Sequence, residues 1–198
     1  MTNRLSIFSA AYWKTAAAEL RKLNRLTLAA LIIALTVVIG SFTIPVAENL
    51  HISFNFLIVA FGSMIYGPLL GIFAGAALDI VGYIAHPFGA FFPGYTLSSM
   101  LGCFIYGLFL YHRRISVMRI FLAKLIVNFV VNVGLGCLWS QVLFGKGYWF
   151  FLVNSLIKNS LMLPIETIML TLLLQALMPI LTRAHVIPVQ NSNRISFI

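Results

Sequence analysis

The sequence predicts an all-α integral membrane protein, and two features of the chain carry this prediction. Of its 198 residues, 61% are hydrophobic and only 9% are charged. Soluble domains have about 45–50% apolar residues and about a quarter charged residues, so this chain lacks the polar residues that a water-exposed surface needs. The second feature is a series of long apolar runs, several of which reach the roughly 20 residues that a helix needs to cross the hydrocarbon core.

Six apolar runs, all expected to be helical, follow one another along the chain. Residues 1–25 precede them as a basic, partly amphipathic segment that does not resemble a cleaved signal peptide, so we expect a cytoplasmic part of the mature protein. Residues 26–182 form the membrane domain, and residues 183–198 form a cytoplasmic tail. The six runs are Leu26–Ile44, Ile52–Tyr66, Leu69–Ala85, Tyr95–Tyr111, Ile120–Phe144 and Phe150–Leu181.

The number of spans depends on the second run, which is short and meets the third run almost directly at Gly67–Pro68. Five spans or a re-entrant hairpin are therefore alternatives to six. The basic residues favour six, because Lys and Arg gather in cytoplasmic segments and two cytoplasmic termini require an even number of spans. With this orientation, ten of the 13 basic residues lie inside and Lys146 lies in an outer loop. The ten are Arg4, Lys14, Arg21, Lys22, Arg25, Arg113, Arg114, Arg119, Arg183 and Arg194.

The composition and motifs of the sequence argue against several other functions. The net charge of +9 does not indicate a nucleic-acid-binding protein, because the basic residues flank apolar runs instead of clustering on a soluble surface. Cys103 and Cys137 lie within apolar runs and indicate neither a disulfide framework nor a metal site. The chain has no phosphate-binding loop, no His-Glu-x-x-His motif and no Gly-x-Ser-x-Gly motif. We therefore expect no enzyme and no ATP hydrolysis by this chain.

Ionisable side chains within the apolar runs are candidates for function, because each costs about 2.5–3.5 kcal/mol at membrane depth. Lys124 is about one turn from the inner end of its run, and we expect it to reach the lipid headgroups. Asp79 continues a line of glycines spaced by four, which lets another helix approach closely. It contacts either a ligand or a structural hydrogen-bond partner. The glycines are Gly67, Gly71 and Gly75.

Further polar residues lie in the last two runs. Lys158 and Asn159 are about two turns from the outer end of the sixth run. Glu166 is two turns deeper, where we expect it to bind a polar group of the protein. Asn128 and Asn132 are one turn apart in the fifth run, where such a pair either joins helices or, for Asn132, lines a cavity.

Aromatic and Gly/Pro-rich residues are concentrated in the outer loops, over residues 86–95 and 145–149. Such aromatics ordinarily form a belt at the membrane interface. The alternative is a cavity for a planar, anionic ligand, whose rings would stack on aromatic side chains and whose carboxylates would pair with lysines. The candidate site comprises Asp79, His86, Phe92, Tyr95, Asn132, Trp139, Lys146, Trp149, Lys158 and Asn159.

Three stretches of the chain resemble the substrate-binding S components of energy-coupling factor (ECF) vitamin transporters, and more specifically their folate-specific group. The first contains Ala30 and Ala34 at Ala-x-x-x-Ala spacing, which is weak evidence because small residues spaced by four are common between membrane helices. The more informative stretches are longer. They are Asp79–Gly82 followed by Pro87–Ser98, which includes Phe-Pro-Gly-Tyr-Thr-Leu-Ser, and Ile157–Glu166, which includes Lys158-Asn159 and Leu163-Pro164.

The resemblance implies a six-helix protein of a bacterial plasma membrane that binds folate. Asp79, Asn132 or Asn159 would bind the edge of the pterin ring, and Lys146 or Lys158 would hold the glutamate tail. A transmembrane coupling protein would dock on Ala30 and Ala34, and two ATPase subunits would use the ATP, so this chain would need no cofactor. The alternatives are an S component for thiamine, riboflavin or biotin, and a stand-alone secondary carrier.

Overall fold

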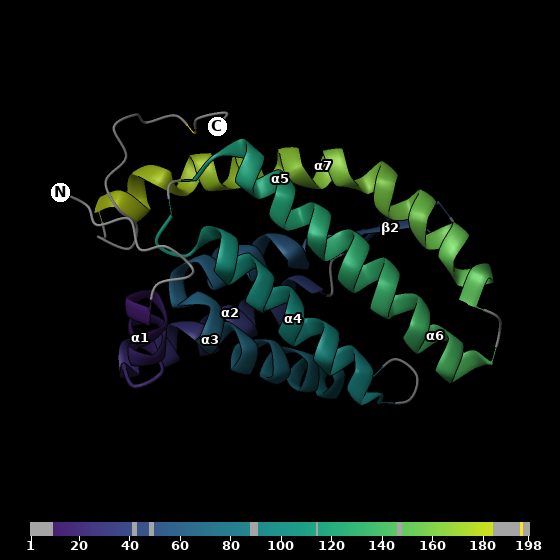
Figure 1. Cartoon of the computed structure of the whole chain (residues 1–198), viewed down its shortest axis with the longest axis horizontal. Helices are drawn as coiled ribbons and strands as arrows, with labels where there is room; N and C mark the ends of the chain where they lie inside the picture. The colour runs from purple at the N-terminus through teal and green to yellow at the C-terminus, as the bar shows by residue number, and fades with distance from the viewer. Residues whose placement is uncertain are drawn as a thin grey trace.

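Helices make up nearly all of the described part of the chain in this computed structural model. It describes residues 10–40, 43–47, 50–87, 91–113, 115–145, 148–183 and 195. Figure 1 shows long helices packed side by side, with α1 at one end of the bundle. The predicted all-α class is therefore confirmed. In this described part, five helices are long and apolar enough to cross a membrane. They are α2 (Leu23–Gly40), α3 (Asn55–Ala85), α4 (Pro93–Leu110), the continuous stretch Val117–Leu143, and α7 (Tyr148–Arg183).

The helix α3 contains both the second and the third predicted run, because the chain bends there instead of forming a loop. The bend is at Gly67, whose φ of 81° and ψ of 177° are not helical. This conformation is open almost only to glycine. Pro68 follows, and its missing N–H removes a helical hydrogen bond at the same place. The Gly67–Pro68 junction therefore divides α3 into two helices of different direction.

The half of α3 that follows Gly67 packs closely on α4 along the predicted line of glycines. A Cβ atom on Gly71 would lie 3.2 Å from the carbonyl oxygen of Cys103. One on Gly75 would lie 2.7 Å from the carbonyl oxygen of Ser99, closer than real Cβ atoms approach. The absence of side chains at these two positions thus allows the backbones of the two helices to meet, as small residues do in membrane helix pairs.

The segment between α2 and α3 differs from the prediction. The first run was expected to stay helical to Ile44, but α2 ends at Gly40. Two short antiparallel strands follow, β1 (Thr43–Ala47) and β2 (Leu50–Ser53). Pro45 lies within β1, and a proline drives the residue before it out of the helical region into an extended conformation.

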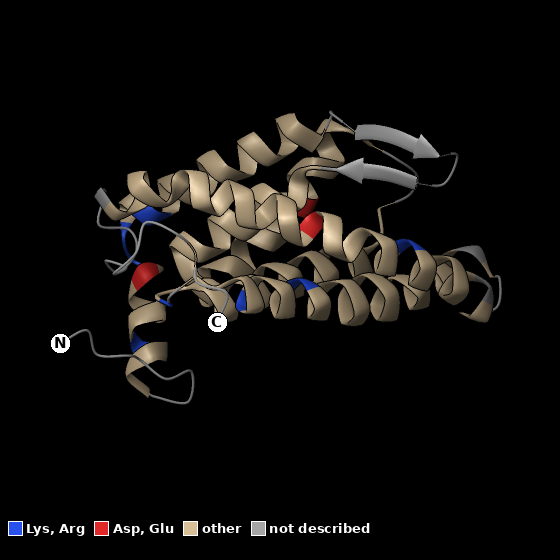
Figure 2. Cartoon of the chain, turned by 90° about the horizontal axis from the view of Figure 1, so that it is seen from above, with Lys and Arg blue, Asp and Glu red and all other residues tan. Residues whose placement is uncertain are grey.

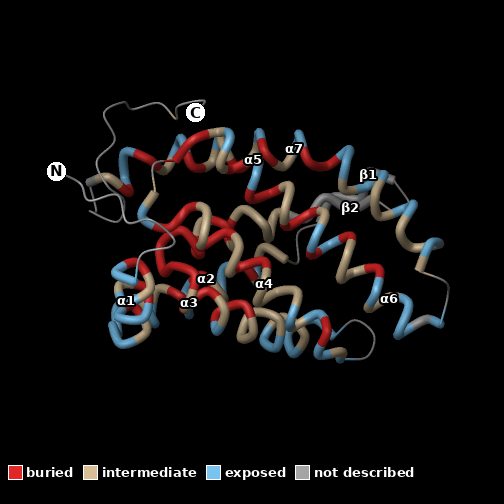
Figure 3. Tube along the Cα trace, viewed as in Figure 1, coloured by how far each residue is buried: buried red, intermediate tan, exposed pale blue. Residues whose placement is uncertain are grey.

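The fifth predicted run is one long helix with a change of pitch in its middle. It consists of α5 (Val117–Ile126), η1 (Val127–Leu135) and α6 (Gly136–Phe144), and η1 is a π-helix. A π-helix has wider turns and is often found at functional sites. The main hydrophobic core lies between α3, α4, α5 and α7, whose inward faces are buried in Figure 3.

The helix α1 (Ala10–Glu19) is packed against the bundle, at the end where α4 finishes. The Tyr12 side chain is buried, and its hydroxyl donates to the carbonyl oxygen of Gly107 at 3.5 Å. Burial raises the pKa of Tyr12 to about 12, so the phenol stays neutral. The carboxylate of Glu19 lies 2.9 Å from the guanidinium of Arg25 in the first turn of α2. Figure 2 shows several of the described Lys and Arg residues at this end.

Candidate functional site

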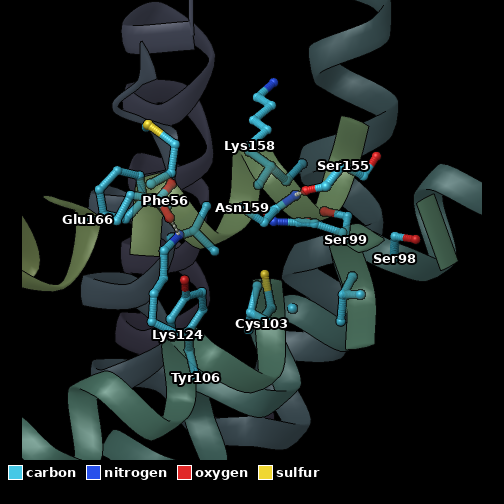
Figure 4. Close-up of a pocket in the computed structure, with 17 residues that line it drawn as sticks. Phe56, Ser98, Ser99, Cys103, Tyr106, Lys124, Ser155, Lys158, Asn159 and Glu166 are labelled. Atoms are coloured by element: carbon cyan, nitrogen blue, oxygen red, sulfur yellow. Dashed lines mark hydrogen bonds and ion pairs between the residues drawn. The ribbon is translucent and has the colours of Figure 1, made fainter. Parts of the chain in front are cut away.

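Two adjoining cavities open between the helices, and Leu78 and Ser99 line both of them. The first has a volume of about 470 Å³ and lies among α3, α4, the α5–η1 helix and α7, as the close-up in Figure 4 shows. The second has a volume of about 420 Å³ and lies among α2, both ends of α3 and the start of α4. Small-molecule sites are concave, mostly apolar and equipped with a few polar groups, and both cavities fit this description.

The floor of the first cavity holds a buried ion pair. The Lys124 side chain is 2% exposed, and its Nζ lies 3.1 Å from Oε2 of Glu166. The same Nζ lies 4.1 Å from the centre of the Phe56 ring, in a cation–π contact. The prediction that Lys124 reaches the headgroups is wrong, because a carboxylate and an aromatic face within the bundle replace water around its charge. The prediction that Glu166 binds a polar group of the protein is confirmed.

The polar contacts continue from the ion pair along η1. Asn128 Nδ2 donates to Glu166 Oε2 at 2.9 Å, and Asn132 Nδ2 donates to Asn128 Oδ1 at 3.3 Å. Asn128 is fully buried, whereas Asn132 lines the cavity. Both alternatives for this pair therefore have support: Asn128 joins η1 to α7, and Asn132 faces the space in which a ligand would lie.

The polar residues of α7 that the sequence singled out lie further along the same cavity. Lys158 and Asn159 both line it. Asn159 Nδ2 donates to the carbonyl oxygen of Ser155 at 2.9 Å, so its amide oxygen is directed elsewhere. Lys158 is exposed, and Figure 4 shows its side chain directed away from Lys124 and Glu166. Lys158 and Glu166 are eight positions apart in the helix, which is about 12 Å along the axis.

Four of the predicted site residues line the second cavity: Asp79, His86, Phe92 and Tyr95. Thr96 Oγ1 donates to Asp79 Oδ2 at 2.6 Å, and this bond joins α3 to α4. Asp79 thus makes a structural hydrogen bond and also lines a cavity, so the sequence alternatives for it both have support. The rings of Phe92 and Tyr95 meet edge to face, with centroids 6.0 Å apart.

The remaining predicted residues contribute less directly. Trp139 lines neither of these two cavities, but its Nε1 donates to Ser98 Oγ at 2.9 Å, and Ser98 lines the first cavity. Trp149 is 75% exposed in the first turn of α7 and lines neither cavity, so it has the position of an interfacial aromatic. Lys146 lies outside the described residues.

One wall of the first cavity was not predicted from the sequence. It comes from α4, and its residues recur every three or four positions along one face of that helix. They are small or polar, unlike the large apolar residues of a lipid-facing surface, and this pattern was the available signal. The residues are Ser98, Ser99, Gly102, Cys103 and Tyr106.

Comparisons with known proteins identify the family of this chain. The family model of the ECF transporter, substrate-specific component, matches residues 24–187. The Folate transporter FolT of Clostridium novyi is 37% identical over 151 residues, which cover 76% of this chain and 88% of that protein. FolT of Leuconostoc mesenteroides is 30% identical, covering 72% of this chain and 80% of that protein.

A solved structure extends the likeness to the fold. The crystal structure of FolT bound with folic acid matches with a TM-score of 0.66 and 32% sequence identity, covering 74% of this chain and 88% of that chain. Together with the family match over most of the chain, this confirms the resemblance derived from the sequence. The chain belongs to the family of substrate-specific components of ECF transporters, and it is a multi-pass membrane protein.

Proposed function

We propose that this chain is the folate-binding subunit of an ATP-driven ECF vitamin importer. The observation that carries the proposal is the first cavity, which combines an interior polar floor with a lysine at its rim. Similarity to folate transporters, and to a FolT structure that contains folic acid, supports folate as the ligand. Folate has a flat pterin ring at one end and two carboxylates at the other, and these features match the two ends of this cavity.

The placement of the polar groups supports one orientation of the ligand. The pterin ring would lie on the floor, where the amide groups of Asn132 and Asn159 face the cavity. The glutamate tail would lie toward Lys158, which lines the cavity and is exposed. The second cavity would receive the ligand from outside, because its aromatic wall adjoins the first cavity at Leu78 and Ser99.

We also propose six membrane-spanning segments with both termini in the cytoplasm. The bend at Gly67 supports this count, because α3 supplies two segments within one helix. The basic residues near α1 support the orientation, since Lys and Arg are enriched on the cytoplasmic side.

The energy for transport would come from partner subunits. A transmembrane coupling protein would dock on Ala30 and Ala34, which are both exposed on α2, and two ATPase subunits would hydrolyse ATP. The family consists of transporter components, so we propose no catalytic role and no cofactor for this chain.

Folate binding by the purified chain tests the proposed function. Lys158→Ala should weaken binding by about 1.5–3 kcal/mol, which is the value of a hydrogen bond to a charged group. Titration calorimetry with folic acid measures the change. Lys158→Arg keeps the charge and should retain most of the affinity, whereas Lys14→Ala, on α1, should have no effect. An unchanged affinity in Lys158→Ala would assign this lysine a structural role.

Two further measurements separate the alternatives. Tight binding of thiamine, riboflavin or biotin without binding of folic acid would contradict the proposed ligand. Folate uptake into vesicles that contain only this chain, without any ATPase, would indicate a stand-alone carrier. The coupled mechanism predicts no uptake in those vesicles.

A further inference from the structure

The ion pair on the floor of the first cavity determines how a neighbouring amide is oriented. Oε2 of Glu166 is close to two donors, Lys124 Nζ at 3.1 Å and Asn128 Nδ2 at 2.9 Å. An ionised carboxylate has no hydrogen to donate, and the ammonium beside it supplies the counter-charge that a buried carboxylate needs. Asn128 must therefore turn its NH₂ group, and not its carbonyl oxygen, toward Glu166.

The orientation of Asn128 in turn fixes that of Asn132. With its NH₂ group on Glu166, Asn128 directs Oδ1 toward Asn132, and this oxygen can only accept. Asn132 therefore donates through Nδ2, at 3.3 Å. Its own Oδ1 then faces away from Asn128, and within the described part of the chain this oxygen has no hydrogen-bond partner. Because Asn132 lines the cavity, it presents an acceptor there.

A second polar group of the floor also lacks a partner. Tyr106 is 2% exposed and lines the same cavity. Among the described residues nothing bonds to its hydroxyl, although buried hydroxyls are nearly always paired. Figure 4 shows this hydroxyl directed toward the interior of the cavity, on the side of Lys124. A hydroxyl can donate, so the floor offers one fixed acceptor and one available donor.

We propose that the Lys124–Glu166 pair is a positioning device that makes the cavity select a lactam edge, with a ring N–H beside a ring carbonyl. Asn132 Oδ1 accepts from the ring N–H, and the Tyr106 hydroxyl donates to the carbonyl oxygen. This inference rests on the proposed function, because the pterin of folic acid carries such an edge at N3–H and the 4-oxo group. Glu166 and Lys124 do not touch the ligand in this arrangement, and they act through Asn128 and Asn132.

The test compares folic acid with its 4-amino-4-deoxy analogue, which has an amino group in place of the 4-oxo group and an unprotonated N3. The wild-type chain should prefer folic acid by about tenfold or more, since the analogue directs a lone pair at Asn132 Oδ1. In Lys124→Met/Glu166→Gln no ammonium remains to hold an oxygen of residue 166 toward Asn128, and the side-chain amide can donate or accept, so Asn132 is no longer held one way. The preference should then fall by about fivefold, with most of the loss on the folic acid side.

The double variant also keeps the test independent of folding. Glu166→Gln leaves Lys124 as a buried charge without its partner, whereas Lys124→Met/Glu166→Gln removes both charges. The double variant should fold and still show the reduced preference. The control is Thr171→Val, also on α7, whose hydroxyl bonds only to the Thr167 carbonyl oxygen and which lines neither described cavity.

Three outcomes would contradict the proposal. The first is a wild-type preference in the double variant, and the second is an equal loss of affinity for both ligands, which a structural role produces. The third is a wild-type chain that binds both ligands equally. A wild-type chain that binds neither ligand would contradict the proposed function itself, and the inference with it.

Discussion

Gly67 is the residue on which the course of α3 depends. Its φ of 81° would strain any other residue, and a Cβ atom there would lie 3.1 Å from the ring of Tyr111. The bend that it allows is also supported from outside the helix, because Arg25 Nη1 donates to the carbonyl oxygen of Ile65 at 3.5 Å. That carbonyl lies in the last turn before the bend, where the regular helical hydrogen bonds end.

Replacement of this glycine should therefore destabilise the protein. Gly67→Ala forces a side chain into a backbone conformation that costs about 1–3 kcal/mol. We expect a lower melting temperature in detergent, measured by the loss of near-UV circular dichroism. The control is Gly82→Ala in the same helix, where a Cβ atom would meet nothing within 4 Å. An equal melting temperature for Gly67→Ala and the wild type would show that the bend tolerates a side chain.

The residue scale also shows what the sequence can and cannot predict about the site. The spacing of Gly71 and Gly75 predicted a close helix contact, because that contact depends on one helix and its own periodicity. The orientation of Lys124 depended on Glu166, which lies on another helix and whose position no local pattern reveals. The position of Lys124 near the end of its run predicted that its side chain reaches the lipid headgroups. In the structure the side chain instead pairs with Glu166 inside the bundle.

Among the helices, α2 has two faces of opposite character. Ala29 and Ile32 are each 5% exposed and face the bundle. Ala30 and Ala34 are exposed, beside Leu31, which is 65% exposed. The exposed small residues leave a shallow strip along the helix, and small residues allow a second helix to approach closely.

This strip predicts a separation of transport from binding. Ala30→Trp or Ala34→Trp should abolish folate uptake in cells that contain the complete transporter, because a large ring would prevent close approach of the proposed coupling protein. Folic acid binding by the purified variant should stay at the wild-type level. Ile168→Trp is the matched control, since Ile168 is 59% exposed on α7 and lies on another face. Loss of binding in either alanine variant would mean that these positions serve the fold.

The elements themselves were predicted unequally. Long apolar runs predicted the helices well, since length and composition suffice for a membrane span. The π-helix η1 was not predicted, because its i→i+5 hydrogen bonds leave no mark in the apolar pattern at this length. The sequence also placed Asn128 and Asn132 on one face, but it did not reveal that Asn128 bonds to Glu166 on another helix.

At the scale of the whole molecule, the number of membrane spans has to agree with the cytoplasmic location that the basic residues indicate for both termini. The described bundle has five candidate spans, and an odd number would place the termini on opposite sides of the membrane. If the two halves of α3 on either side of the bend count as two spans, the total is six, and both termini can lie in the cytoplasm. The number of spans is therefore tested by measuring on which side of the membrane each end of the chain lies.

Labelling with a membrane-impermeant maleimide makes that measurement. Background should be low, because Cys103 and Cys137 are both buried at 1% exposure. Lys14→Cys on α1 and Arg183→Cys in the last turn of α7 should react only after the cells are permeabilised. Trp149→Cys should react in intact cells, since this position is 75% exposed at the opposite end of α7.

A mid-bundle control, Ile168→Cys, should stay unlabelled in both conditions, because lipid covers an apolar position at that depth. Labelling of Lys14→Cys and Arg183→Cys from opposite sides would establish an odd number of spans and contradict the proposed count. Labelling of Trp149→Cys only after permeabilisation would instead reverse the orientation. In that case the rim at Lys158 would face the cytoplasm, and the chain could not capture folate from outside.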